Sequence, residues 1–230
     1  MREAQVIARN IDQFLIAREG NVLNKLIAIG GVEQQESFEI QVKARIDDLS
    51  ITEPLLNDRR VQVVKHTHYR QYDHYFIFVD ENQGRVRYRE DDSLDKDGNV
   101  ETVRTRITFT SPTKEREFDE AVLLSRSQFL APADRPLRFY REYFRPTTER
   151  EVEKERQRWH ILYKGVLFYV NVDTLIDPKL EGKFLEIKSQ TWSKRDAEYK
   201  ATLISEILID ILGLTPEKRV RKEYLEFAIA

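Results

Sequence analysis

Residues 37–46 read S-F-E-I-Q-V-K-A-R-I, and polar and apolar side chains alternate through the whole segment. Successive side chains of a β-strand point to opposite faces, so Ile40 and Val42 would share one face while Lys43 and Arg45 share the other. The segment therefore predicts a strand with one apolar face and one charged face.

Arginine and lysine recur on alternate residues in three further stretches: R-V-R-Y-R at 85–89, R-T-R at 104–106 and K-E-R-Q-R at 154–158. The chain has 38 Lys and Arg against 40 Asp and Glu, so these rows do not reflect a generally basic protein. Several strands that turn such rows toward one space would form a polyanion site. A solvated sheet face is the alternative interpretation of each single row.

Composition limits the function classes. The chain has 230 residues, of which 40% are hydrophobic, and its net charge of −2 argues against a protein that coats nucleic acid. It contains no cysteine, which excludes disulfides and thiolate metal sites and fits a cytoplasmic location. The N-terminal residues lack the apolar core of a secretory signal, and no apolar run is long enough to predict a membrane span.

The patterns predict an α+β protein with an antiparallel sheet of about eight strands, flanking helices and an N-terminal helical extension. We assign residues 1–36 to the extension and residues 37–230 to a single domain. We expect that the extension could contact a second copy of the chain, as a homodimer, or another protein partner. The predicted strands are 37–46, 59–79 (one bent strand or a pair), 85–90, 101–110, 151–162, 166–173 and 183–190. The predicted helices are 2–18, 21–29, 114–130, 135–144 and 216–227, and Asp134 is the predicted cap of 135–144. A further helix is predicted to begin with a capping box of Ser193 and Asp196 and to end at Gly213.

The order of these motifs resembles the CYTH superfamily of triphosphate tunnel enzymes, which includes class IV adenylate cyclases and thiamine triphosphatases. The first four motifs of the family are E-x-E-x-K, matched at 39–43, D-x-Y-F at 73–76, R-x-R at 85–89 and T-x-K-G-P at 108–112. The remaining three are K-x-R, matched at 154–156, a metal-site Asp at Asp173 and E-x-E at 186–188. In the R-x-R strand the register is open between Arg85-Val86-Arg87 and Arg87-Tyr88-Arg89. The similarity covers residues 37–227 and implies an eight-stranded antiparallel barrel with a charged tunnel.

The resemblance also implies roles for single residues. Glu39 and Lys43 would serve catalysis, and Glu39, Asp173 and Glu186 would hold Mg²⁺ or Mn²⁺, which prefer oxygen ligands. Arg and Lys donors match phosphate oxygens. The predicted contacts to a triphosphate are Lys43, Arg45, Arg85, Arg87, Arg89, Arg104, Arg106, Lys154, Arg156, Arg158 and Lys188.

Three positions depart from the family pattern. Gln41 replaces the second Glu of E-x-E-x-K, Thr110 replaces a Lys, and Lys188 replaces the second Glu of the last E-x-E. An ammonium about 5 Å from Mg²⁺ would cost roughly 6–7 kcal/mol before screening at an effective dielectric of about 20. Two functions therefore stay open. One is metal-dependent hydrolysis of tripolyphosphate or of a nucleoside or thiamine triphosphate; the other is a binding module for polyphosphate or a nucleotide without turnover.

Overall fold

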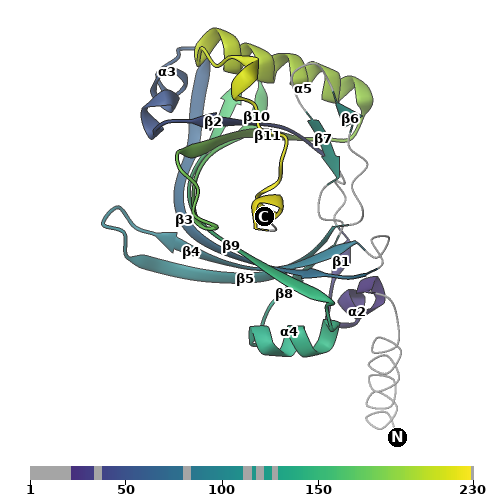
Figure 1. Ribbon diagram of the computed structural model, residues 1–230. Coiled ribbons are helices and arrows are strands. Elements are labelled where there is room, and N and C mark those ends of the chain that lie inside the picture. Colours follow the sequence, from purple (N-terminus) through teal and green to yellow (C-terminus); the bar gives the residue numbers. More distant parts are fainter. Residues whose placement is uncertain are drawn as a thin grey trace, which may run out of the picture.

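The computed structural model describes residues 22–33, 38–79, 84–110, 116–117, 122–125 and 129–228. Its centre is one antiparallel sheet in the order β1-β8-β5-β4-β3-β9-β10-β11-β2-β7-β6, and the sheet curls strongly about an axis (Figure 1). The strands are β1 (Val32–Glu33), β2 (Phe38–Ile46), β3 (Val61–Ile77), β4 (Arg85–Leu94), β5 (Val100–Thr110), β6 (Arg116–Glu117), β7 (Val122–Ser125), β8 (Phe129–Pro132), β9 (Thr148–Tyr163), β10 (Val166–Asp177) and β11 (Lys183–Thr191).

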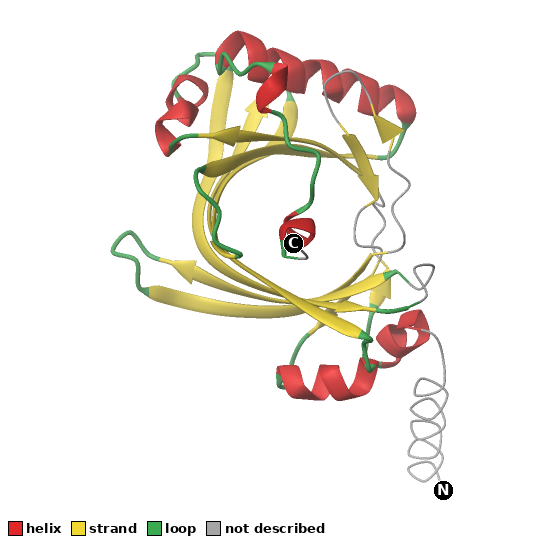
Figure 2. Cartoon of the chain, in the orientation of Figure 1, coloured by secondary structure: helices red, strands yellow, loops and turns green. Residues whose placement is uncertain are grey.

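The helices lie on the outside of the curled sheet at two opposite sides, except for the last one, which lies inside the curve (Figure 2). The helical elements are α2 (Val22–Ala28), a 3₁₀ turn (Leu49–Thr52), α3 (Glu53–Leu56), α4 (Leu137–Phe144), α5 (Lys194–Glu206), a π-helical segment (Ile207–Ile211), a 3₁₀ turn (Pro216–Lys218) and α6 (Tyr224–Phe227). Within the part of the chain that the structure describes, no helix is long and apolar enough to cross a bilayer.

The predicted α+β class and the antiparallel sheet are confirmed, and short strands at the two edges bring the sheet to eleven strands. Hydrogen bonds do not close the sheet into a barrel, because β1 and β6 are its edges and do not pair with each other in the described ranges. Within the residues that the structure describes, the sheet is therefore strongly curved but not closed by hydrogen bonds, and the predicted barrel is not confirmed.

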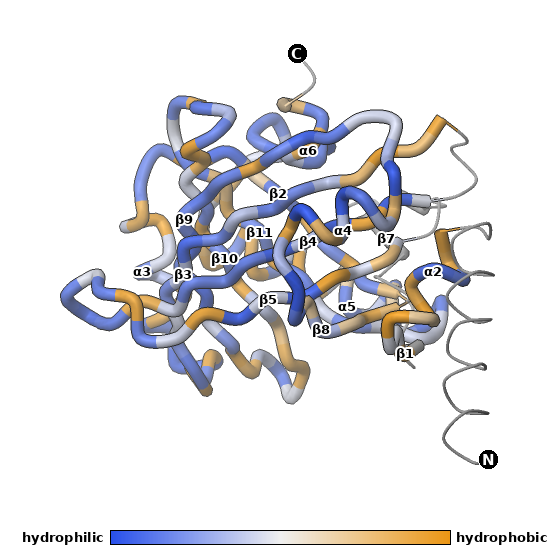
Figure 3. Tube along the Cα trace, turned by 90° about the horizontal axis from the view of Figure 1, so that it is seen from below, coloured by the Kyte–Doolittle hydropathy of each residue, from blue (hydrophilic) through white to orange (hydrophobic). Residues whose placement is uncertain are grey.

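Two apolar cores lie between the outer face of the sheet and the helices. One packs α5 against residues such as Ile40 and Ile187 of β2 and β11, and the other packs α4 against Phe76 and Ile107 of β3 and β5. Because the apolar faces of the strands turn outward to these helices, the polar faces turn inward. Figure 3 shows the resulting hydrophilic residues along the middle of β2, β3 and β9 rather than only at the strand ends.

Several predicted boundaries match the structure. The segment 59–79 forms one long strand rather than a pair, and 21–29 contains α2. Ser193 caps α5, since its hydroxyl accepts a hydrogen bond from the Asp196 N–H at 3.1 Å. Gly98 forms the predicted β4–β5 turn with a φ of 85°, which favours glycine. The helix predicted at 2–18 lies outside the described residues.

Two predicted helices and one predicted cap were wrong, whereas the helix predicted at 135–144 is confirmed as α4. Within 114–130, the described residues 116–117, 122–125 and 129–130 are strands, because the apolar run around Val122 pairs with the edge of β2. Asp134 does not cap α4, whose N-cap is Pro136, and the Asp134 carboxylate accepts from the Tyr140 hydroxyl instead. The segment 216–227 forms two short helices because its middle bonds to β2 through Val220 N–H and the Lys43 carbonyl.

Candidate polyanion-binding site

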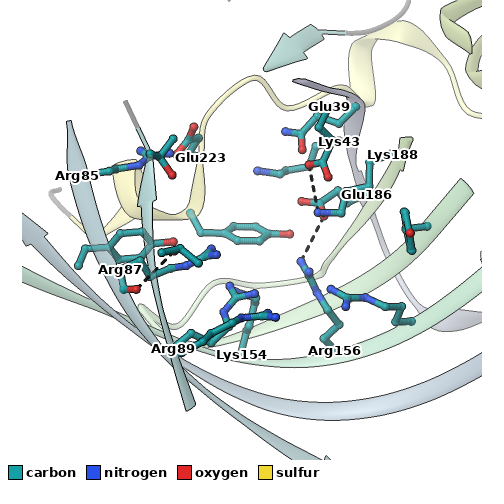
Figure 4. A pocket seen from close by; sticks show the side chains of 18 of the residues that line it. Glu39, Lys43, Arg85, Arg87, Arg89, Lys154, Arg156, Glu186, Lys188 and Glu223 are labelled. Atoms are coloured by element: carbon teal, nitrogen blue, oxygen red, sulfur yellow. Dashed lines mark hydrogen bonds and ion pairs between the residues drawn. The ribbon is translucent and has the colours of Figure 1, made fainter. Parts of the chain in front are cut away.

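The inner face of the curled sheet surrounds a cavity of about 350 Å³ whose described lining is dominated by cations. The cations that Figure 4 labels come from opposite walls of the curled sheet and point toward one space. The lining cations are Lys43, Arg85, Arg87, Arg89, Arg106, Lys154, Arg156, Arg158 and Lys188, and the lining carboxylates are Glu39, Glu186 and Glu223. The alternation read from the sequence thus brings charged strand faces together rather than exposing them to solvent.

Asp73 on β3 organises the cations at the β4–β9 side of the cavity. Its side chain is fully buried and accepts two hydrogen bonds from Arg89, both at 2.5 Å, and one from Lys154 at 2.8 Å. Burial would raise the pKa of the Asp73 carboxyl, but Arg89 and Lys154 outweigh it and hold that pKa well below its usual range. Asp73 is therefore a fixed anion that orients these two cations.

A second buried acid, Asp173 on β10, holds Arg156 in the same way. The Arg156 guanidinium donates to both oxygens of Asp173, at 2.6 and 2.5 Å, and one of its nitrogens lies 3.4 Å from Glu186. Glu186 also accepts from the Asn171 amide at 2.8 Å. The carboxylates predicted as metal ligands thus have protein partners.

Lys188 lies where the resemblance implies a metal-binding carboxylate. Its ammonium is 3.3 Å from Glu39 and 3.5 Å from Glu186. Burial would raise the pKa of the Glu186 carboxyl, but Lys188 and Arg156 outweigh it and hold that pKa well below its usual range. A cation that is part of the chain therefore neutralises both acids.

The contacts of Glu39, Asp173 and Glu186 show whether these carboxylates could hold a metal ion together. Glu39, Asp173 and Glu186 do not converge on a common point that a cation could occupy, and the described residues include no cluster of three or more His, Cys, Asp or Glu side chains able to hold a metal ion. Asp173 is bound on both oxygens by Arg156, and Lys188 lies between Glu39 and Glu186. The residues present do not fit the predicted Mg²⁺ or Mn²⁺ site.

The lining arginines Arg87, Arg106 and Arg158 form no bidentate ion pair with an acid that the structure describes. Arg158 donates its Nε to the neutral Asn171 amide at 2.8 Å, and the Nε atoms of Arg87 and Arg106 are buried without a hydrogen-bond partner among the described residues. Burial, and then Arg156 and Arg89, lower the pKa of Arg158 to about 10. Burial, and then Arg89, lower the pKa of Arg106 to about 10. This lowering means that the protein resists these charges, which an anionic ligand would stabilise.

The C-terminal segment fills one end of the cavity. Tyr224 and Leu225 pack among apolar side chains of the sheet, including Phe184. The Lys43 ammonium lies 4.1 Å from the centroid of the Tyr224 ring and donates to the Lys222 carbonyl at 3.0 Å. Burial lowers the pKa of Lys43. At the same end Glu223 lies 2.6 Å from Arg85.

The structure brings nine of the eleven predicted phosphate contacts to the cavity and leaves out two. Arg45 is exposed and donates to the Glu181 carbonyl at 2.7 Å, because it lies near the end of β2 where its side chain reaches the rim. Arg104 is exposed toward the free end of β5. Arg85, Arg87 and Arg89 all line the cavity, so both registers of the R-x-R motif contribute to it.

Sequence reasoning assigned no role at the site to four residues that the structure places at or beside this cavity: Asp73, Tyr169, Glu223 and Tyr224. Asp73 shares the strand face of Tyr75, so its inward direction could have been read from β3. Glu223 and Tyr224 could not have been found in this way, because the inward return of the chain end has no periodic signal.

Comparisons with known proteins establish the fold. No family model and no curated protein sequence matches the chain. The structure resembles the PH1819 protein of Pyrococcus horikoshii OT3, with a TM-score of 0.57 and 17% identity over 83% of this chain and 98% of that one. It also resembles a Vibrio parahaemolyticus protein provisionally named an adenylate cyclase, with a TM-score of 0.51 and 13% identity over 85% of this chain and 100% of that one. Over most of its length the chain thus shares the fold of these two proteins.

Proposed function

We propose that the cavity binds a triphosphate or polyphosphate chain. The observation that carries this proposal is the convergence of nine Lys and Arg side chains on one cavity, while the three carboxylates that line it leave an excess of positive charge. Asp73, Asp91 and Asp173 lie behind the lining and still do not balance it. Like charges held in a buried space require a compensating anion or water.

The shape of the cationic set supports a chain of phosphates rather than one phosphate. The guanidinium groups of Arg87, Arg106 and Arg158 come from three different strands, and Lys188 comes from the opposite side of the cavity. Planar guanidinium groups bind phosphate oxygens bidentately, so separate arginines suit successive phosphates. The cavity volume of about 350 Å³ falls within the range of small-ligand sites.

Metal-dependent hydrolysis of the same anion is the second candidate. Glu39 and Glu186 line the cavity, which supports it, but Lys188 lies between them and Asp173 is bound to Arg156. A divalent metal would neutralise charge that develops during phosphoryl transfer. Because the described residues do not form a site for it, binding without turnover is the function that the geometry supports better.

The test measures tripolyphosphate binding by titration calorimetry, once in EDTA and once in Mg²⁺. We expect binding in EDTA. Arg158→Gln should weaken it by roughly 1.5–3 kcal/mol, or about ten- to a hundredfold, through loss of a charge-assisted contact. Arg104→Gln removes an exposed arginine outside the cavity and should leave the affinity unchanged. Equal affinity of both variants would contradict the proposal.

Phosphate release separates the two candidates. We expect no release above background from tripolyphosphate in Mg²⁺ or Mn²⁺ under conditions where calorimetry shows binding. Sustained release that chelation stops would instead establish the hydrolase, and it would show that the metal displaces Lys188 or Arg156 from its partner acids.

A further inference from the structure

Arg156 and Arg158 are two residues apart on the inner face of β9, and they meet different kinds of side chain on β10. Arg156 lies opposite Asp173 and donates to both of its carboxylate oxygens. Arg158 lies opposite Asn171 and donates its Nε to the amide oxygen at 2.8 Å. The same pair of strands therefore holds one arginine that is neutralised and, beside it, one arginine whose acceptor carries no charge.

The Asn171 side chain has a second partner on the other side of β10. Asn171 is 0% exposed, and its amide nitrogen donates to Glu186 of β11 at 2.8 Å. Asn171 lies opposite both Arg158 and Glu186, so the three side chains form one row across β9, β10 and β11. An amide group provides the acceptor and the donor that this row requires, whereas an ionised carboxylate can only accept and would repel Glu186.

The other contacts of Arg158 leave its charge available to a ligand. Arg158 lines the cavity, and its guanidinium carbon lies 5.7 Å from the centroid of the Tyr69 ring. Within the described part of the chain, its side chain has the Asn171 amide as hydrogen-bond acceptor and forms no ion pair. Burial would lower the pKa of Arg156, but Asp173 and Glu186 outweigh it and raise that pKa, whereas the pKa of Arg158 is lowered. The two neighbouring arginines thus differ in whether the protein already compensates their charge.

We propose that Asn171 is a positioning residue, which aims the Arg158 guanidinium at the bound polyanion without neutralising it. The inference rests on the proposed function and deepens it, because it names the residue that sets how strongly Arg158 contributes to binding. A guanidinium that is held at its Nε keeps its two Nη nitrogens for phosphate oxygens, which guanidinium groups bind bidentately. A carboxylate in place of the amide would make Arg158 a second buried ion pair, and an apolar side chain would leave it without an anchor.

The experiment measures tripolyphosphate binding by titration calorimetry in EDTA, in double-mutant cycles. Asn171→Leu removes the amide without changing any charge, and it should weaken binding about five- to tenfold, within the range of one hydrogen bond. In the Arg158→Gln background the same substitution should change the affinity by less than about twofold, because the residue that Asn171 positions is gone. In the Arg87→Gln background it should again weaken binding about five- to tenfold, because Arg87 lines the cavity from β4 and has no contact with Asn171. A general loosening of the fold would act equally in all three backgrounds.

A second substitution tests the role of the neutral amide. Asn171→Asp should weaken tripolyphosphate binding about ten- to a hundredfold, as Arg158→Gln does, because its carboxylate would neutralise Arg158. Asn57→Asp adds the same charge at an exposed position outside the cavity lining and should leave the affinity unchanged. Thermal melts confirm that the variants are folded. If Asn171→Leu does not fold, Asn171→Thr takes its place in the cycles, since one hydroxyl oxygen cannot occupy the positions of both the amide oxygen and the amide nitrogen.

The outcomes separate this inference from the proposed function. If the wild type binds tripolyphosphate and Asn171→Leu weakens binding equally with and without Arg158→Gln, the positioning role is refuted while the phosphate site stands. Unchanged affinity of Asn171→Leu also refutes it. Wild-type affinity of Asn171→Asp would show that the neutral amide does not preserve the charge of Arg158. If tripolyphosphate does not bind the wild type, the proposed function fails, and the inference with it.

Discussion

Arg156 donates to both carboxylate oxygens of Asp173, at 2.6 and 2.5 Å, and both side chains are almost completely buried. Arg156 thus binds the carboxylate that the family resemblance assigns to a metal ion. Asp173 therefore holds Arg156 in place. A substitution at Asp173 should lower the free energy of unfolding of the protein.

We predict that Asp173→Asn destabilises the protein by about 3–5 kcal/mol, because removing one partner of a buried ion pair leaves the other charge uncompensated. Urea unfolding followed by circular dichroism measures the change in the free energy of unfolding. Asp177→Asn, at an exposed position on the same strand, is the control and should be nearly neutral. A stable Asp173→Asn protein that lost only a response to Mg²⁺ would show that Asp173 is a metal ligand after all.

Lys188 allows a gain-of-function test. Lys188→Glu would place a third carboxylate beside Glu39 and Glu186 and remove the ammonium now 3.3 and 3.5 Å from them. We expect the variant to bind Mg²⁺, to lose affinity for tripolyphosphate in EDTA, and to recover part of it in Mg²⁺. Calorimetry measures three dissociation constants: that of Mg²⁺ alone, that of tripolyphosphate in EDTA and that of tripolyphosphate in Mg²⁺.

The control for this substitution is Lys179→Glu, which makes the same charge change at an exposed position outside the cavity lining. It should leave Mg²⁺ and tripolyphosphate binding at the wild-type level. If Lys188→Glu bound no more Mg²⁺ than Lys179→Glu, Lys188 would not occupy a latent metal position.

Lys154 predicts a pH dependence of binding. Burial, then the neighbouring Arg89 and Arg156, lower its pKa to about 8, although Asp73 opposes this. Below pH 8 the ammonium is already charged, and above pH 8 it must take up a proton when the polyanion binds. The tripolyphosphate affinity should therefore fall as pH rises from 8 toward 10, by at most about tenfold per pH unit for one proton.

Dissociation constants at pH 7, 8, 9 and 9.5 check this prediction. Lys154→Arg keeps the charge throughout that range and should flatten the curve, and a thermal melt confirms that the variant is folded. Two outcomes would contradict the role given to Lys154. One is a wild-type dissociation constant that does not change with pH, and the other is a dissociation constant that rises with pH as steeply in Lys154→Arg as in the wild type.

The inner face of the sheet could be predicted from sequence because its signal is local. The alternation around Lys43, Arg87 and Arg156 fixes which side chains share a strand face, and the apolar residues between them must pack against helices. What alternation cannot give is the partner of each charge. The buried pairing of Arg89 with Asp73 joins two strands, and only their register across the sheet reveals it.

The wrong helix at 114–130 has a comparable cause. A run that contains Val122 and Leu123 is compatible with either a helix or a buried strand, and the choice depends on the free edge of β2 that Val122 pairs with. The C-terminal return past Val220 also depends on distant backbone groups, those of β2. Neither outcome has a signal within the segment itself.

Glu223 gives the last prediction, because it is an anion of the chain itself that lies 2.6 Å from Arg85 at the closed end of the cavity. A bound polyphosphate that reaches Arg85 must compete with this carboxylate. We therefore expect Glu223→Gln to tighten tripolyphosphate binding by about two- to fivefold, the range that a partly exposed ion pair is worth. Glu217→Gln, on the exposed turn before α6, should change nothing. Calorimetry in EDTA distinguishes the two variants. Weaker binding by Glu223→Gln would mean that the carboxylate positions Arg85 for the ligand instead of competing with it.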